Sequence, residues 1–115
     1  MRRGEIRMVD LDPVRGSEAD KRRPAVLVSN DGANTTATRL ARGVVTVVPV
    51  TSNTRRVYPF QVLLPAEECG LRSASKAQAE QVRAVAFERV GEPIGRVPPS
   101  LMANLDEALR LHLAL

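Results

Sequence analysis

The sequence predicts a small, mostly β fold, in which an antiparallel barrel is followed by one C-terminal helix. The apolar runs are short and rich in valine, which is typical of strands. Turn-forming residues separate these runs at short intervals, a pattern that favours a small barrel. Leucines recur at helical spacing only near the C-terminus. Because the 115 residues contain no internal repeat and no long linker, we expect a single domain over residues 1–115.

Each expected strand is an apolar run bounded by turn signals. The run 44–50 is the strongest, because β-branched residues dominate it. The turns are expected at the Asp-Pro, Gly-Ser, Asn-Asp-Gly, Ser-Asn and Cys-Gly steps. In chain order, the expected strands cover residues 5–11, 25–28, 44–50, 59–64, 78–86 and 94–97.

The C-terminal segment is predicted to form a helix of about four turns that begins at Pro99. One face of this helix would pack on the barrel. Leu111 and Leu115 lie on another face, which favours a homodimer or a docking groove for a partner. Alternatively, its own domain buries the helix on two sides. The residues at helical spacing on the packed face are Leu101, Leu105, Ala108, Leu109, His112 and Leu113.

Residue counts exclude several classes of protein. Cys69 is the only cysteine and His112 the only histidine, which excludes an intrachain disulfide framework, a cysteine zinc cluster and any mechanism that needs two imidazoles. No apolar run approaches the ~18 residues of a membrane span. The basic N-terminus is not followed by the apolar stretch of a signal peptide. We therefore expect a cytoplasmic protein with no membrane association.

Positive charge is concentrated in particular segments. The chain has 17 Lys and Arg residues against 13 Asp and Glu, a net charge of +4, and 15 of the cations are arginine. Residues 32–66 contain four arginines and no acid, and a second basic group precedes the valine run at 25–28. Arginine presents a planar fork of donors that matches phosphate oxygens, so the pattern fits a polyanion partner. The alternative is a solvated basic face.

The segment 16–26 joins a turn to a strand and is the densest polar stretch. Pro24 restricts Arg23 to an extended conformation and so directs it to the start of the strand. Glu18 lies five residues earlier, across a turn. The two could act as an acid/base pair around one phosphate, or form a surface ion pair worth less than about 1 kcal/mol.

Two further segments carry polar groups at strand positions. The run 47–53 ends at Thr51, Ser52 and Asn53, whose side chains could hydrogen-bond phosphate or base edges, or form an ordinary turn. Within 76–83, Gln78, Glu80 and Val82 would share one strand face. A charged residue in such a run is expected to point to solvent.

Short motifs follow one another in a fixed order along the chain. The N-terminal half carries RGEI at 3–6, VDLDP at 9–13, GSE at 16–18 and RRPAV at 22–26. The C-terminal half carries VPVTS at 48–52, YPF at 58–60, AEQVR at 79–83 and IGRV at 94–97. This ordered set resembles the MazF/PemK toxin family over nearly the whole chain.

The resemblance implies a small SH3-like barrel with a C-terminal helix that works as a homodimer. It further implies a sequence-specific endoribonuclease that acts on single-stranded RNA, chiefly messenger RNA, independently of the ribosome. A cognate antitoxin would silence it, and an acidic disordered peptide could wrap the basic groove and the apolar dimer surface. The catalytic residues of the family fall on Glu18, Arg23 and Thr51.

RNA supplies its own nucleophile, the 2′-hydroxyl, so the expected reaction requires no metal and no cofactor. We expect Glu18 to accept the hydroxyl proton, Arg23 to clamp the phosphate oxygens and Thr51 to hydrogen-bond the phosphate. The products would be a 2′,3′-cyclic phosphate and a 5′-hydroxyl. The residues expected to bind RNA are Lys21, Arg22, Ser52, Asn53, Arg55, Arg56 and Glu80.

Base recognition is less evident in the sequence. Tyr58 and Phe60 are interpreted as core or interface residues rather than stacking platforms. Arginine planes could take the stacking role instead, with Arg55 and Arg56 the best candidates. The segment 30–42 is interpreted as a loop that lines or covers the RNA groove.

The chain departs from the family at three positions. Arg7 stands where tryptophan is usual, Glu80 where aspartate is common, and Pro98 replaces a helix-capping serine at a cost of about 1 kcal/mol. Two alternatives keep the fold without the nuclease. One is a CcdB-like toxin that inhibits DNA gyrase, and the other is a barrel that binds RNA without cleaving it.

Overall fold

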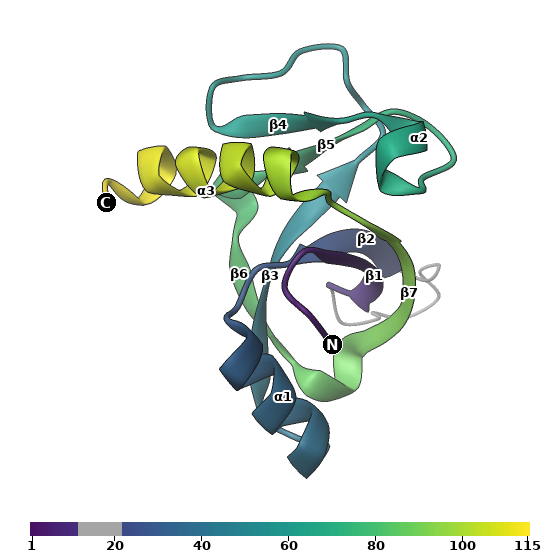
Figure 1. Ribbon diagram of the computed structural model, residues 1–115, viewed down its shortest axis with the longest axis vertical. Coiled ribbons are helices and arrows are strands. Elements are labelled where there is room, and N and C mark those ends of the chain that lie inside the picture. The colour runs from purple at the N-terminus through teal and green to yellow at the C-terminus, as the bar shows by residue number, and fades with distance from the viewer. Residues whose placement is uncertain (12–21) are drawn as a thin grey trace, which may run out of the picture.

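The computed structural model describes residues 1–11 and 22–115 as seven strands, three α-helices and two 3-10 turns (Figure 1). In chain order these are β1 (Glu5–Asp10), β2 (Arg22–Leu27), α1 (Asp31–Leu40), β3 (Val44–Thr51), β4 (Gln61–Leu64), α2 (Ala66–Cys69), β5 (Ser75–Gln78), η1 (Ala79–Gln81), β6 (Arg83–Ala86), η2 (Phe87–Arg89), β7 (Val90–Arg96) and α3 (Pro99–Leu113).

All described strand pairings are antiparallel, in the order β4-β5-β3-β2-β1-β7, and β6 also pairs with β3. Strand β3 organises the sheet, because its eight residues pair with β2 on one side and with both β6 and β5 on the other. Within the described residues, the strand path does not return from β7 to β4. The predicted fold class, mostly antiparallel β with a barrel-like sheet and a C-terminal helix, is confirmed.

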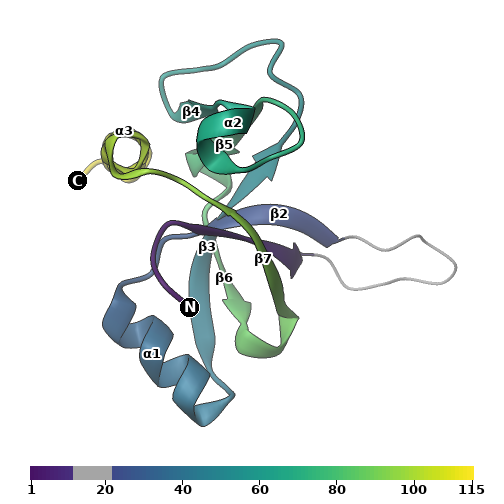
Figure 2. The same ribbon diagram turned by 45° about the vertical axis from the view of Figure 1, so that its right-hand side comes forward.

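The sheet separates two hydrophobic cores, because side chains alternate between its faces. Val26 of β2 and Val48 of β3 belong to the first core, which α3 covers with Leu105. Ala25 and Val47 belong to the second core, which α1 covers with Ala37. Figure 2 shows α3 above and α1 below the level of β1 and β2. Strands β2 and β3 therefore have one core on each face, and their polar end residues continue the same two faces.

The predicted single strand 78–86 is wrong, because β5 ends at Gln78 and a separate strand, β6, begins only at Arg83. Strand β5 pairs with β3 at Val50 and Thr51, whereas β6 pairs with its first half, at 44–47. The 3-10 turn Ala79–Gln81 makes the step between these positions. Glu80 therefore lies in a turn, and its carboxylate accepts a hydrogen bond from Gln61 Nε2 at 2.6 Å instead of pointing to solvent.

The segment 30–42 is a helix rather than the predicted loop. Asn30 caps α1, because its Oδ1 accepts a hydrogen bond from Ala33 N at 2.8 Å. The helix ends at Ala41, which has a left-handed conformation with φ 52°. Asn34 is fully buried, and its Oδ1 accepts a hydrogen bond from Ser29 Oγ at 2.5 Å. α1 lies at the far end of the molecule from β4 and β5 (Figure 1).

The predicted C-terminal helix is confirmed in position, with one correction to its packed face. Leu105 and Ala108 are buried as expected, but His112 and Leu113 are exposed, because the last turn extends beyond the strands. Leu111 and Leu115 are also exposed. No side chain caps the start of the helix at Pro98. Within the described ranges, no helix is long and apolar enough to cross a membrane.

Candidate active site

Arg23 lies at the open end of β2, where the strand leaves the second core. It pairs with Val9 of β1, and alternation along β2 places it on the same face as Ala25 and Leu27. The Arg23 side chain is exposed and makes no hydrogen bond or ion pair with any residue of the described ranges. Among the described residues, therefore, none occupies its guanidinium donors.

Thr51 ends β3, the strand next to β2. The recorded β2–β3 pairs run from Leu27–Val47 to Ala25–Pro49. Arg23 and Thr51 each lie two residues beyond the last recorded pair, and alternation puts each of them on the same side of its strand as that pair. Thr51 Oγ1 accepts a hydrogen bond from Asn53 N at 3.2 Å, which leaves the hydroxyl hydrogen free to be donated. The fold thus places the two predicted catalytic residues at adjacent ends of neighbouring strands, although they are 28 positions apart in the sequence.

Lys76, to which sequence reasoning assigned no role, lies next to Thr51 in the sheet. Lys76 of β5 is the cross-strand partner of Thr51, so both side chains project from the same face. Lys76 is 8% exposed, and its Nζ donates to the main-chain oxygen of Arg56 at 2.6 Å. The only sequence signal was its rarity, as one of two lysines among 17 cations.

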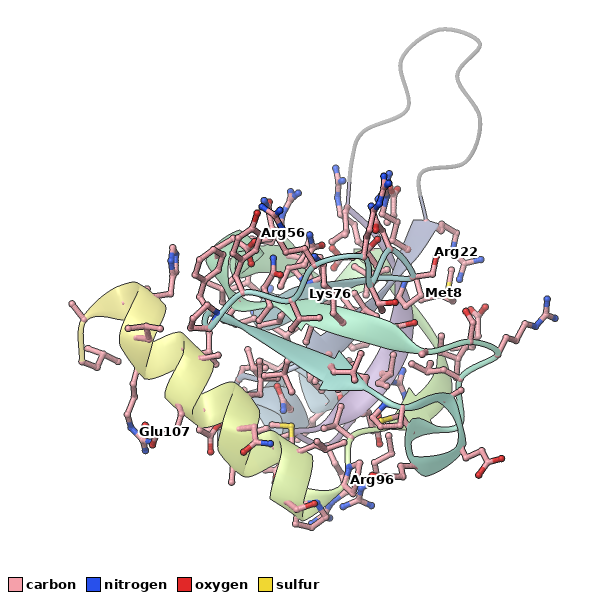
Figure 3. The ribbon with its side chains drawn as sticks, turned by 90° about the horizontal axis from the view of Figure 1, so that it is seen from above. Met8, Arg22, Arg56, Lys76, Arg96 and Glu107 are labelled. Atoms are coloured by element: carbon pink, nitrogen blue, oxygen red, sulfur yellow. The ribbon has the colours of Figure 1, made fainter. Side chains whose placement is uncertain are left out.

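Beside Thr51 and Lys76, the loop after β3 forms a cleft of about 560 Å³, here called the cationic cleft. The hydrogen bond of Asn53 Oδ1 with Arg55 N, at 3.2 Å, helps to shape this loop. Arg56 and Lys76 lie together on this side of the molecule, opposite Glu107 on α3 (Figure 3). No described acidic side chain lines the cleft. Its lining residues are Asn53, Arg55, Arg56, Tyr58 and Lys76.

Tyr58 is a surface residue of this cleft, so of the two predicted settings, core or interface, the core is wrong. The Tyr58 side chain is 41% exposed, and its ring lies parallel to that of Phe60 with the centroids 5.3 Å apart. The Tyr58 hydroxyl pairs with Arg56 Nη1 at 3.2 Å. An accessible aromatic ring next to arginines is a common feature of sites that bind single-stranded nucleic acids.

A second cleft, of about 600 Å³ and here called the serine cleft, lies on the other face of the same strand ends. Ser52 lines it, and so is separated from its neighbour Asn53 in the cationic cleft. Pro24 and Val50 form part of its apolar floor, and Ser75 contributes a hydroxyl. The predicted RNA-binding residues are therefore divided between two faces.

Arg22 and Arg7 have partners within the protein. Arg22 Nη2 lies 2.5 Å from Glu92 Oε2, and the pKa of Glu92 is lowered by its own main-chain amide and by Arg22. Arg7, at the position of the family's tryptophan, donates to Glu5 Oε1 and to the main-chain oxygen of Gly91, both at 2.9 Å. Burial alone would raise the pKa of Glu5, but the hydrogen bond and charge of Arg7 outweigh burial and lower it.

Glu80 lies beneath the loop and does not line either cleft. Its Oε2 accepts from Gln61 Nε2, and Gln61 Oε1 in turn accepts from Tyr58 N at 3.2 Å. The other carboxylate oxygen of Glu80 is buried without a hydrogen-bond partner. Glu18 and Lys21, which sequence reasoning also placed in the site, lie outside the described residues.

Comparisons of the sequence give a consistent relationship. A family model described as PemK-like, MazF-like toxin of type II toxin-antitoxin system matches residues 2–113. Endoribonuclease MazF9 of Mycobacterium tuberculosis (strain ATCC 25618 / H37Rv) is 68% identical over 115 residues, which cover 100% of this chain and 98% of that relative.

Solved structures share the fold over the full chain. A MazE–MazF crystal structure from Deinococcus radiodurans (Form-II) has a TM-score of 0.80 and 26% identity, and covers 100% of this chain and 96% of that chain. An endoribonuclease in complex with its cognate antitoxin, from a mycobacterial species, has a TM-score of 0.76 and 25% identity, with coverage of 100% and 96%.

Proposed function

The chain belongs to the family of PemK-like, MazF-like toxins of type II toxin–antitoxin systems, and we propose that it is a sequence-specific endoribonuclease that cleaves single-stranded messenger RNA and thereby inhibits translation and growth. One observation carries the proposal. Arg23 and Thr51 lie at adjacent ends of neighbouring strands, and Thr51 pairs with Lys76, which lines the cationic cleft. The 68% identity to a protein named an endoribonuclease supports the same activity.

In the proposed reaction, Arg23 binds the non-bridging oxygens of the scissile phosphate and stabilises the charge that develops on them. Thr51 donates its hydroxyl hydrogen to the same phosphate. Glu18 accepts the proton of the 2′-hydroxyl as this oxygen attacks phosphorus. The new bond joins the 2′-oxygen to phosphorus, and the bond from phosphorus to the 5′-oxygen breaks.

The departing 5′-oxygen takes a proton from water, and Glu18 returns its proton to the solvent, which gives a 5′-hydroxyl end and a 2′,3′-cyclic phosphate. Because the nucleophile belongs to the substrate, we propose that the reaction needs no metal ion and no cofactor. The RNA strand would contact residues on both sides of the catalytic pair. These are Lys21, Arg22, Ser52, Asn53, Arg55 and Arg56.

We further propose that the protein acts in the cytoplasm, as one domain over residues 1–115 that forms a homodimer and is silenced by a cognate antitoxin. The structural relative solved with its cognate antitoxin supports an antitoxin partner. The end of α3 carries three exposed leucines, Leu111, Leu113 and Leu115. They support an apolar surface for contact with a second protomer or with the antitoxin.

The proposal is tested by incubating the purified protein with a long single-stranded RNA in excess EDTA. We expect discrete fragments with 2′,3′-cyclic phosphate and 5′-hydroxyl ends, detected by end-specific ligation and sequencing. A matched reaction with added Mg²⁺ should give the same fragments.

The same assay separates the alternatives. RNA that is retarded in a gel but remains intact would indicate a binding protein without nuclease activity. Intact, unbound RNA together with inhibition of DNA gyrase would indicate a CcdB-like toxin. Either result would contradict the nuclease proposal.

A further inference from the structure

The cationic cleft contains a buried positive charge with no counter-charge among the described residues. Lys76 is 8% exposed, yet its Nζ contacts a main-chain oxygen and no described carboxylate. An ammonium group has three N–H donors, and the bond to Arg56 uses one of them. Because burial of an uncompensated cation is unfavourable, an anion that enters this cleft would be stabilised.

The cleft also offers an aromatic surface to the same ligand. Phe60 stacks on Tyr58 but does not line the cleft, so the part of Tyr58 that faces the cleft is not covered by Phe60. Arg56 Cζ and Lys76 Nζ lie 5.8 and 6.0 Å from the centroid of the Tyr58 ring. An anion site beside an aromatic surface matches the two parts of a nucleotide, its phosphate and its base.

Tyr58 is held in place by the protein before any ligand binds. Its main-chain nitrogen donates to Gln61 Oε1 at 3.2 Å, and Gln61 Nε2 donates to Glu80 Oε2 at 2.6 Å. Its main-chain oxygen accepts from Gln61 N at 2.9 Å. These bonds fix the main chain of Tyr58, and its ring is restrained by stacking on Phe60 and by the hydrogen bond from Arg56, so it loses little conformational freedom when a base stacks on it.

We propose that the cationic cleft is a nucleotide subsite, in which Tyr58 stacks on one base of the RNA strand and Lys76 and Arg56 bind its phosphate. This inference rests on the proposed function, and adds the position of a neighbouring nucleotide. Because Lys76 is the cross-strand partner of Thr51, the subsite takes the nucleotide next to the scissile phosphate.

The experiment uses a spectroscopic property of this chain. Tyr58 is the only tyrosine and there is no tryptophan, so the tyrosine emission of the full-length protein reports on Tyr58 alone. The protein is titrated with a 2′-O-methyl oligonucleotide, which lacks the nucleophile and cannot be cleaved. We expect saturable quenching, with the same midpoint as the anisotropy change of the labelled oligonucleotide.

Variants separate the two parts of the subsite. Tyr58→Ala should weaken binding on the order of 10-fold to 100-fold, and Tyr58→Phe should restore most of this loss because it keeps the ring. Lys76→Met should weaken binding and reduce the slope of log K against log salt by about 0.7, the value for one phosphate contact on a single strand. Arg42→Gln removes an exposed charge near α1 and should change neither quantity.

The outcomes distinguish this proposal from the nuclease assignment. Oligonucleotide binding without a change in tyrosine emission, together with full affinity in Tyr58→Ala, would overturn the subsite even if RNA is cleaved. If Lys76→Met leaves the slope of log K against log salt unchanged, Lys76 does not bind a phosphate and this part of the proposal is wrong. If the protein leaves all RNA intact but the oligonucleotide still quenches Tyr58, the subsite is supported and the nuclease assignment fails.

Discussion

Arg23 and Arg22 are adjacent in the sequence but differ in their surroundings. Arg22 is engaged with Glu92 at 2.5 Å, whereas Arg23 has no side-chain partner in the described ranges. Within the described ranges, therefore, no ion pair has to break before the Arg23 donors meet a phosphate. We therefore propose Arg23 for the scissile phosphate and Arg22 only for a contact with the RNA strand.

At this scale we predict that Arg23→Ala lowers kcat/KM for a short fluorogenic RNA on the order of 100-fold or more, because the developing phosphate charge loses its main donors. Thr51→Val should cost about 10-fold, since it removes one neutral hydrogen bond, and Thr51→Ser should restore the rate. Arg42→Ala is the matched control and should leave kcat/KM unchanged. Equal rates for Arg23→Ala and the parent would contradict the proposed mechanism.

Among the secondary-structure elements, α3 begins without a side-chain cap. Pro98 occupies the cap position with φ −66° and ψ 159°, and only its main-chain oxygen accepts hydrogen bonds, from Leu101 N and Met102 N. A serine at this position would provide a hydroxyl for one of the unpaired amides of the first turn.

We therefore predict that Pro98→Ser melts about 4 °C higher than Pro98→Ala, which corresponds to a cap worth about 1 kcal/mol. Both variants lose the proline ring, so its effect on the unfolded chain cancels in the comparison. Thermal unfolding followed by circular dichroism gives both values. Identical melting temperatures would show that the hydroxyl does not cap the helix.

In the molecule as a whole, arginines hold carboxylates at several junctions between elements. Arg7 pairs with Glu5 and also joins β1 to β7, and Arg3 donates to Asp106 of α3 at 2.6 Å. The pKa of Asp31 is lowered mainly by a hydrogen bond from the main-chain nitrogen of Arg3. Each lowered carboxyl pKa means that the folded state favours the charged form.

A lowered pKa stabilises the fold at pH values above the ordinary pKa, and this stabilisation is lost as the pH falls through the folded value. For Glu5 the ordinary value is 4.5, so the free energy of unfolding should decrease as the pH falls below about 4.5. We predict that Arg7→Met weakens this dependence, as measured by urea unfolding at a series of pH values. Arg42→Gln should keep the parental slope, and a parental slope in Arg7→Met would contradict the assignment.

Much of the fold was predictable from local patterns. The valine-rich runs predicted most strands, and the leucine spacing predicted α3, because alternation and helical periodicity report directly on which face is buried. The segments 30–42 and 78–86 were predicted wrongly. In the first, the cap signal at Asn30 was present but outweighed by threonines. In the segment 78–86, the interruption between β5 and β6 arises because the two strands pair with different parts of β3, which no local pattern shows.

The sequence by itself determined the fold class, the ordered motifs and the identities of Arg23 and Thr51 as candidates. Only the tertiary structure decided that Arg23 and Thr51 lie at adjacent ends of neighbouring strands, that Lys76 pairs with Thr51 and that Ser52 lines the other cleft. The physical reason is that strand register sets which distant side chains share a face, and register arises from pairing across the whole sheet rather than from any one segment.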